Sequence, residues 1–162
     1  MEVQVFVEIP NGSNLKYEVD PTTGNLILDR VLSSAMNYPG NYGYIENTLA
    51  KDGDPLDVLI IVPYALHPGC YVKCRVIGAL VMTDEKGLDE KIIAVPTSEV
   101  DPHYADISDI SDVPKSQLEK IRHFFEYYKH MDEGKWSTIQ GFVDSKEAMS
   151  LIHNNQTAYV AS

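Results

Sequence analysis

The chain has 162 residues, a length that suits one domain with one hydrophobic core. Acidic residues outnumber basic ones by 24 to 13, and the net charge of −11 argues against nucleic acid or an anionic membrane as a partner. The longest apolar run, residues 58–62, is too short to cross a bilayer, and the N-terminus lacks the pattern of a secretory signal. We therefore expect a cytoplasmic protein.

The first thirty residues indicate β-strands. Residues 1–9 alternate between apolar and polar side chains, which is the period of a half-buried strand, and Pro10-Asn11-Gly12 ends that strand. Residues 16–20 and 25–30 flank the turn-forming segment Pro21-Thr22-Thr23-Gly24 and predict a hairpin.

The middle of the chain predicts further short strands. Residues 33–57 have no clear period and contain several glycines and prolines, so we interpret them mostly as loop. Strands are expected over residues 58–62, over residues 71–82 with a bend at Gly78, and over residues 91–95. This succession of strands and turns predicts a small closed barrel.

The last third is helical in pattern. A first helix is predicted by apolar residues at helical spacing, namely Leu118, Ile121, Phe124, Phe125 and Tyr128. Pro114 suits its first turn, and Asp144 with Glu147 predicts a capping box for a second helix. The fold class expected is α+β: one domain over residues 1–162, with helices packed outside a β-barrel.

Three aspartates, Asp52, Asp54 and Asp57, lie within six residues. Such a group suits a hard cation such as Mg²⁺, but it also suits a solvated acidic turn, which is the more common case for an isolated run. An EF-hand loop starting at Asp52 is excluded because its sixth and twelfth positions hold Asp57 and Pro63. A phosphotransferase nucleophile is disfavoured because the apolar strand follows the run instead of preceding it.

Two other segments combine carboxylates with a lysine. Asp84 and Asp89 precede Lys91, and Lys16 and Glu18 lie on one face of a predicted strand. Interleaved charges of this kind suit a site that binds metal and phosphate together. They suit equally well a set of solvent-facing salt bridges of little energetic value. On spacing alone, the two interpretations are level.

Seven segments in this order resemble the soluble family I inorganic pyrophosphatases of the short bacterial kind. They are Val7-Glu8-Ile9-Pro10, Lys16-Tyr17-Glu18, Asp29-Arg30, Tyr38-Pro39 with Asn41-Tyr42-Gly43-Tyr44, Asp52-Gly53-Asp54-Pro55-Leu56-Asp57-Val58, Met82-Thr83-Asp84-Glu85 with Asp89-Glu90-Lys91, and His123-Phe124-Phe125-Glu126-Tyr127-Tyr128-Lys129. The resemblance implies a five-stranded, OB-like barrel with helices outside, an acidic cavity, and hydrolysis of pyrophosphate to two phosphates. It also implies three or four Mg²⁺ ions per site, with Mn²⁺ or Zn²⁺ as substitutes, and a homohexamer.

By position, the resemblance implies that Asp54 is the general base. Asp52, Asp57 and Asp89 would hold the first metal, with Asp57 reaching the second. The remaining implied metal ligands are Asp84 with Asp89 for a third ion, and Glu8 and Glu18 for a fourth. The side chains implied to bind phosphate oxygens are Lys16, Arg30, Tyr42, Lys91, Tyr128 and Lys129, with Tyr38 behind them.

Two other functions stay open at this point. One is a divalent-metal or phosphate-binding module without catalysis, and the other is a phosphotransferase that uses an aspartyl nucleophile. Departures from the family pattern also occur: Leu88 replaces a residue that is often acidic, and Tyr127 and His130 replace residues near a subunit contact. None of these three positions is an implied site residue.

Overall fold

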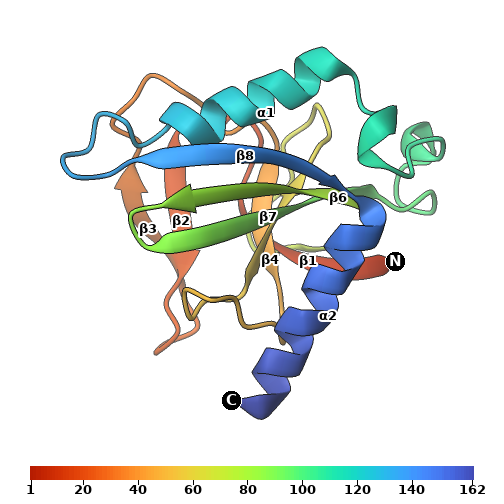
Figure 1. Cartoon of the computed structure of the whole chain (residues 1–162), viewed down its shortest axis with the longest axis horizontal. Coiled ribbons are helices and arrows are strands. Elements are labelled where there is room, and N and C mark those ends of the chain that lie inside the picture. The colour runs from red at the N-terminus through yellow and green to blue at the C-terminus, as the bar shows by residue number, and fades with distance from the viewer.

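The computed structural model describes residues 1–162. Figure 1 shows a strand-rich body with two α-helices on its outside. The strands are β1 (Glu2–Ile9), β2 (Leu15–Val19), β3 (Leu26–Val31), β4 (Asn41–Ile45), β5 (Leu56–Ile60), β6 (Tyr71–Asp84), β7 (Gly87–Pro96) and β8 (Ser137–Asp144). The helices are α1 (Lys115–Tyr127) and α2 (Ser145–Ala161), with short 3-10 turns η1 (Pro102–Tyr104) and η2 (Ile110–Asp112).

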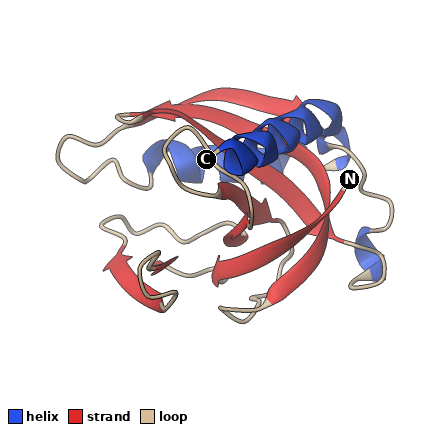
Figure 2. Ribbon diagram, turned by 90° about the horizontal axis from the view of Figure 1, so that it is seen from below, coloured by secondary structure: helices blue, strands red, loops and turns tan.

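Five strands pair in a ring. The sheet order runs β1-β4-β5-β7-β6, and an additional pairing between β1 and β6 joins the two ends. All of these pairings are antiparallel except β5 with β7. The expected five-stranded barrel with outer helices is therefore confirmed, and the curved strands are seen in Figure 2. The hairpin of β2 and β3 forms a separate two-stranded sheet beside the ring.

Strand β6 belongs to two parts of the sheet. Its first residues, 71–75, pair with β1, whereas residues 78–84 pair with β8. The ladder with β7 shifts register between Val76 and Gly78, where a Cβ on the glycine would come within 2.6 Å of the Val143 carbonyl oxygen. The bend expected at Gly78 thus coincides with a close approach of β8, which a larger residue would block.

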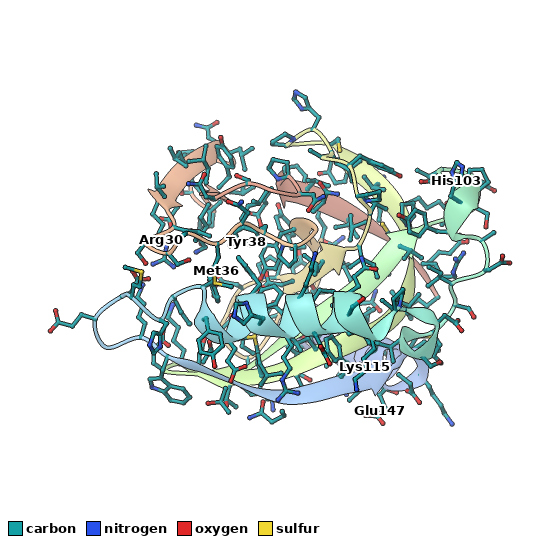
Figure 3. The ribbon with its side chains drawn as sticks, turned by 90° about the horizontal axis from the view of Figure 1, so that it is seen from above. Arg30, Met36, Tyr38, His103, Lys115 and Glu147 are labelled. Atoms are coloured by element: carbon teal, nitrogen blue, oxygen red, sulfur yellow. The ribbon has the colours of Figure 1, made fainter.

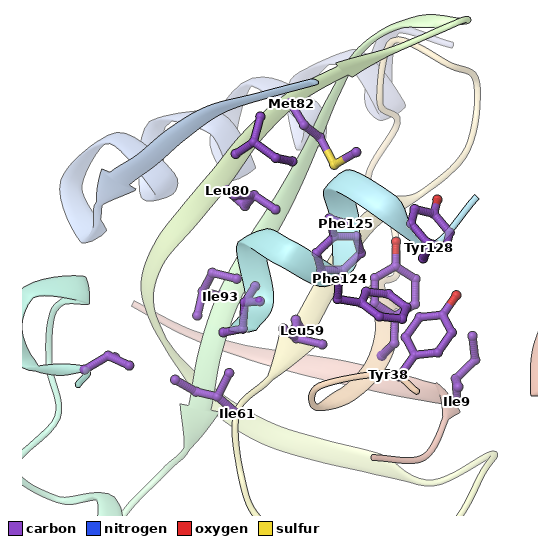
Figure 4. Packing of buried hydrophobic residues seen from close by; sticks show 14 of the residues in the cluster. Ile9, Tyr38, Leu59, Ile61, Leu80, Met82, Ile93, Phe124, Phe125 and Tyr128 are labelled. Atoms are coloured by element: carbon purple, nitrogen blue, oxygen red, sulfur yellow. The ribbon is translucent and has the colours of Figure 1, made fainter. Parts of the chain in front are cut away.

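Alternation along the strands separates two hydrophobic clusters. One contains Val5, Val58 and Ile92 of the ring strands, together with Ala148 and Ile152 of α2. The other contains Leu59 and Ile93, the neighbours of Val58 and Ile92, together with aromatic residues of α1 (Figure 4). Helix α1 therefore covers one outer wall of the barrel.

Several element boundaries differ from the sequence-based expectation. Residues 33–57 are mostly loop, as expected, but β4 lies within them, and β5 begins at Leu56, two residues before the predicted strand. Strand β4 shows no alternation because it is buried on both faces. Strand β8 was not expected at all; it is half-exposed and contains Gly141. Pro114 is the N-cap of α1, one residue before the first turn.

Other local expectations are confirmed. The hairpin closes around residues 20–25, where Asp20 N donates to Asn25 O at 2.8 Å. Helix α2 begins at the expected cap, since Asp144 Oδ1 accepts a hydrogen bond of 2.9 Å from Glu147 N. The two cysteines, Cys70 and Cys74, are free. No helix combines the length and hydropathy that a membrane crossing requires.

Candidate active site

A cavity of about 420 Å³ lies between the β2–β3 hairpin, the wall formed by β4, β5 and β7, and the end of α1. All fourteen side chains that the sequence singled out line it: Glu8, Lys16, Glu18, Arg30, Tyr38, Tyr42, Asp52, Asp54, Asp57, Asp84, Asp89, Lys91, Tyr128 and Lys129. The structure thus brings together residues that are up to 121 positions apart in the chain. Their individual chemical roles stay predictions.

The barrel wall contributes a buried ammonium between two carboxylates. Asp57 of β5 and Lys91 of β7 are directly opposite in the parallel ladder, and Lys91 Nζ lies 2.8 Å from Asp57 Oδ2 and 3.0 Å from Asp89 Oδ2. Burial by itself would lower the pKa of Lys91, but Asp57, Tyr42 and Asp89 raise it well above the ordinary value. Lys91 is therefore a permanent positive charge in the cavity wall.

A second cation, Lys129, lies just beyond the end of α1. Its Nζ donates to Asp84 Oδ2 at 3.0 Å and to Glu85 Oε1 at 3.2 Å. Burial acts against the charge of Lys129, but Tyr128 and Asp84 raise its pKa above the ordinary value. Burial of Asp84 is likewise outweighed by hydrogen bonds from Lys129 and from the Lys86 backbone, so the pKa of Asp84 is lowered. This pair ties helix α1 to the end of β6.

The β2–β3 hairpin supplies Lys16, Glu18 and Arg30. Lys16 Nζ donates to Glu18 Oε1 at 2.7 Å, and Val19 N donates to Glu8 Oε2 at 3.0 Å, which joins the hairpin to the barrel. Burial raises the pKa of Glu8 to about 7, against the opposing effect of that hydrogen bond. Arg30 Nε is buried and has no hydrogen-bond partner within the chain. A buried donor of this kind calls for an acceptor from a ligand.

The loop before β5 presents Asp52 and Asp54. Asp54 N donates to Asp52 Oδ1 at 3.0 Å, and Gly53 between them has φ +89°, a left-handed conformation that favours glycine. Burial, followed by the charges of Asp52 and Asp57, raises the pKa of Asp54, and Lys86 opposes this rise. A carboxylate with a raised pKa is a better proton acceptor near neutral pH than an ordinary aspartate.

Three tyrosines close the apolar side of the cavity. Tyr38, Tyr42 and Tyr128 belong to the cluster under α1, with the Tyr128 ring stacked on Phe124 at 5.1 Å (Figure 4). Burial is the main cause that raises the pKa of Tyr42, so its hydroxyl remains a neutral donor. Figure 3 shows Arg30 and Tyr38 near the same end of the molecule, away from His103.

Sequence reasoning did not assign roles to three further charged residues of the cavity: Glu85, Lys86 and Lys135. Glu85 lay inside a quoted motif, so its place beside Asp84 gave a usable signal. Lys86 and Lys135 belong to no pattern in the sequence. They reach the cavity only because the β6–β8 pairing brings their two loops together.

The donor set fits a hard divalent cation. Eight carboxylates line the cavity, and it has no histidine or cysteine ligand. No three of these carboxylates lie close enough together to hold an ion as they stand, because lysines occupy the positions between them.

Carboxylates, buried cations and tyrosine hydroxyls converging beside a small barrel define an enzyme site for an anionic, metal-bound substrate. Comparison with known proteins gives the family. The inorganic pyrophosphatase family model matches residues 5–160, and the chain belongs to that family. Membership implies a divalent metal cofactor.

Relatives and solved structures agree along nearly the whole chain. The inorganic pyrophosphatase of Nanoarchaeum equitans is 50% identical over 98% of each chain, and that of Campylobacter jejuni is 46% identical over 93% of this chain and 88% of its own. Among solved structures, the inorganic pyrophosphatase from Helicobacter pylori matches with a TM-score of 0.95 and 44% identity, over 98% of this chain and 93% of its own. That from Thermus thermophilus matches with a TM-score of 0.94 and 46% identity, over 98% and 91%.

Proposed function

We propose that this chain hydrolyses inorganic pyrophosphate to two phosphates. The observation that carries the proposal is the mixed composition of the cavity, where eight carboxylates and six cationic side chains line the same space. Carboxylates alone would suit a metal-binding module, and cations alone would suit an anion-binding module. Together they suit a substrate that arrives with metal ions, and family membership supports that substrate in particular.

We propose Mg²⁺ as the cofactor, three to four ions per site, with Mn²⁺ or Zn²⁺ as substitutes. Asp52, Asp57 and Asp89 would hold the first ion and Asp57 the second. The other proposed ligands are Asp84 with Asp89, and Glu8 with Glu18. Bound divalent ions supply charge neutralisation for the phosphates and lower the pKa of water.

Asp54 is the proposed general base. Its carboxylate is exposed at the cavity edge and has a raised pKa, so it can accept a proton from the attacking water. Arg30 can hold a phosphate with parallel hydrogen bonds, and its Nε, which has no hydrogen-bond partner within the chain, supports this role. Lys91 and Lys129 act as fixed positive charges for the phosphate oxygens, because their pKa values are raised despite burial.

The remaining substrate contacts complete the assignment. Lys16 adds a cation from the hairpin, and Tyr42 and Tyr128 add hydroxyl donors. Tyr38 would orient Tyr42 directly, since their rings lie 5.3 Å apart. It would orient Tyr128 through Phe124, whose ring lies 4.6 Å from Tyr38 and 5.1 Å from Tyr128. Groups already in position can stabilise charge that develops on the leaving phosphate.

The test is phosphate release from pyrophosphate by the purified protein with Mg²⁺, Mn²⁺ or Zn²⁺ and with a chelator. We expect turnover with metal and none with chelator. Binding of metal and pyrophosphate without turnover would favour the alternative of a binding module without catalysis. Trapping of a phosphorylated aspartate during turnover would favour an aspartyl phosphotransferase over direct attack by water.

We further propose a homohexamer of single-domain subunits in the cytoplasm. The family match over residues 5–160 supports one domain, and the net charge of −11 argues against a nucleic acid or membrane partner. Light scattering should give a mass near six times the 18.1 kDa of the chain. A mass near 18.1 kDa would contradict the hexamer.

A further inference from the structure

Two cationic side chains of the cavity have no carboxylate partner. Lys16, Arg30, Lys91 and Lys129 each lie between 2.7 and 3.7 Å from a carboxylate oxygen. Lys86 and Lys135 also line the cavity but form no ion pair within the chain. Their charges are therefore not offset locally, and they are available to an incoming anion.

The pairing of β6 with β8 places these two lysines at the same edge of the cavity. Asp84, the last residue of β6, is paired with Ser137, the first of β8. Lys86 lies two residues after Asp84, in the turn between β6 and β7, and Lys135 lies two residues before Ser137. The two loops are joined where Trp136 N donates to Glu85 Oε2 at 3.3 Å. Figure 1 shows both loops at the same side of the molecule, at the left.

The positions of both lysines are set by backbone interactions. Lys86 N donates to Asp84 Oδ1 at 2.9 Å, which fixes the turn that carries it, and its side chain is exposed. Lys135 N donates to Asp132 O at 3.2 Å, and its residue is half-buried. The charge of Lys86 acts on Asp54 at the cavity edge, where it opposes the rise in the pKa of that carboxylate. Both residues line the cavity, Lys86 from an exposed position and Lys135 from a half-buried one.

The rest of the molecule is negatively charged, so two lysines at the cavity edge can aid the association of an anionic substrate. The chain carries a net charge of −11, and the cavity holds two more carboxylates than cations. A polyanionic substrate is repelled by this field at long range, even where bound cations attract it at short range. Local positive charge at the entrance of a cleft focuses the field and can raise association rates by a factor of about 10 or more.

We propose that Lys86 and Lys135 form a capture pair, which draws the anionic diphosphate into the cavity without taking part in the chemical step. The proposal rests on the proposed function. It differs from the roles assigned to Lys91 and Lys129, which are buried and paired deep in the site. A capture pair acts on association, so it changes kcat/KM and leaves kcat nearly unchanged.

The test compares two double variants with equal changes in net charge. Lys86→Gln with Lys135→Gln removes the capture pair. Lys115→Gln with Lys146→Gln removes two exposed lysines outside the cavity; Figure 3 shows Lys115, and Glu147 beside Lys146, away from Arg30. The probe is methylenediphosphonate with Mg²⁺, which resists hydrolysis. The fluorescence of Trp136, the single tryptophan, reports its association in a stopped-flow experiment.

We expect the capture-pair variant to bind the probe about tenfold more slowly at an ionic strength of about 0.01 M, where charge acts over roughly 30 Å. The difference should vanish near 1 M, where the range is about 3 Å. Steady-state hydrolysis should show the same loss in kcat/KM, with kcat within about twofold of the native value.

Three results would overturn the proposal. An equal loss in the Lys115→Gln/Lys146→Gln variant would show an effect of overall charge alone. A loss that persists unchanged at 1 M salt, or a fall in kcat, would place the lysines in direct contact with the reacting groups. Unchanged association would remove their role altogether. The association rate needs no turnover, so a failure of capture and a failure of hydrolysis are separate results.

Discussion

Lys91 and Asp57 are opposed residues of two parallel strands, and their side chains join at 2.8 Å across the ladder between β7 and β5. The backbone pairing therefore fixes an ion pair in the wall of the active-site cavity. The same Nζ contacts Asp89 at 3.0 Å, so a single ammonium bridges two carboxylates. Both carboxylates are proposed metal ligands, and the lysine offsets part of their mutual repulsion.

Replacing Lys91 should lower the free energy of unfolding measured in chelator. It should also increase the gain in stability that added Mg²⁺ produces. In Lys91→Met, two carboxylates face each other without a cation, and breaking a buried pair costs about 3 kcal/mol. Unfolding by urea in chelator should show this loss, and added Mg²⁺ should restore part of it. The control is Lys73→Met, whose pair with Glu2 is exposed to solvent and therefore contributes little to stability. Equal stability of Lys91→Met and native protein in chelator would contradict the interpretation.

Removing the proposed general base should affect the rate and not the fold. Asp54→Asn keeps the size of the side chain but cannot accept a proton, so kcat should fall by a factor of about 10² to 10⁴. Phosphate release measures the rate, and circular dichroism checks the fold. Asp106→Asn, at an exposed position outside the cavity, is the matched control and should keep native turnover. Native turnover in Asp54→Asn would rule out the base assignment.

Divalent ions should raise the thermal stability of the folded protein. A ligand that binds only the native state at 100 times its Kd adds about 2.7 kcal/mol. The Tm should therefore rise with Mg²⁺ concentration and fall back with chelator. Asp52→Asn and Asp89→Asn should flatten this dependence, whereas Asp106→Asn should retain it. A Tm that ignores Mg²⁺ in the native protein would speak against the metal site.

Asp101, a carboxylate that does not line the cavity, should make the stability of the folded protein depend on pH in the acid range. Asp101 accepts hydrogen bonds from the Tyr64 hydroxyl at 2.6 Å and from His103 N at 3.0 Å, and these hold the pKa of Asp101 below its usual range. Because the folded pKa is depressed, the stabilisation is present above the unfolded pKa of about 4 and is lost as pH falls through the folded value.

Urea unfolding of native protein and Asp101→Asn can measure this dependence. The difference in unfolding free energy between them should be constant down to about pH 5 and should shrink toward about pH 3. Tyr64→Phe removes the first of the two donors and should show part of the same effect. Asp106→Asn serves again as control, with no such trend. A difference that grows on acidification would reverse the assigned direction of the pKa shift.

Gly43 should tolerate no side chain. A Cβ at this position would collide with the carbonyl oxygen of Phe6, on the neighbouring strand β1. Gly43→Ala should therefore cost about 3 kcal/mol or more, because the β1–β4 pairing must open. Gly24→Ala is the control: it has open space and φ +73°, so it carries only a backbone cost of roughly 1 kcal/mol. Thermal unfolding separates the two, and similar losses would contradict the steric argument.

The sequence predicted the site better than it predicted the sheet. Short sequence motifs identified the fourteen candidate site residues, and all fourteen side chains line one cavity. Strand β4 was missed because Asn41 and Gly43 are poor strand formers and because a strand buried on both faces has no alternation. Strand β8 was missed because its pattern is weakened by Gly141 and by partial exposure.

Some of the site depends on pairing that a linear pattern does not contain. The contact of Lys91 with Asp57 joins residues 34 positions apart, and its geometry follows from the parallel register. The positions of Lys86 and Lys135 follow from the β6–β8 register. Neither register can be read from local periodicity, which gives the face of a strand but not its neighbour.

Closure of the ring through residues 2–6 and 71–75 also bears on how quickly the protein can acquire activity. Pairings this distant in the chain must overcome a large entropy of loop closure, which slows folding. The cavity needs residues from Glu8 to Lys135, so a nascent chain cannot form it until most of its length has been synthesised. A ribosome-bound chain that ends before α1 should have no catalytic capacity, even if part of the barrel has already formed.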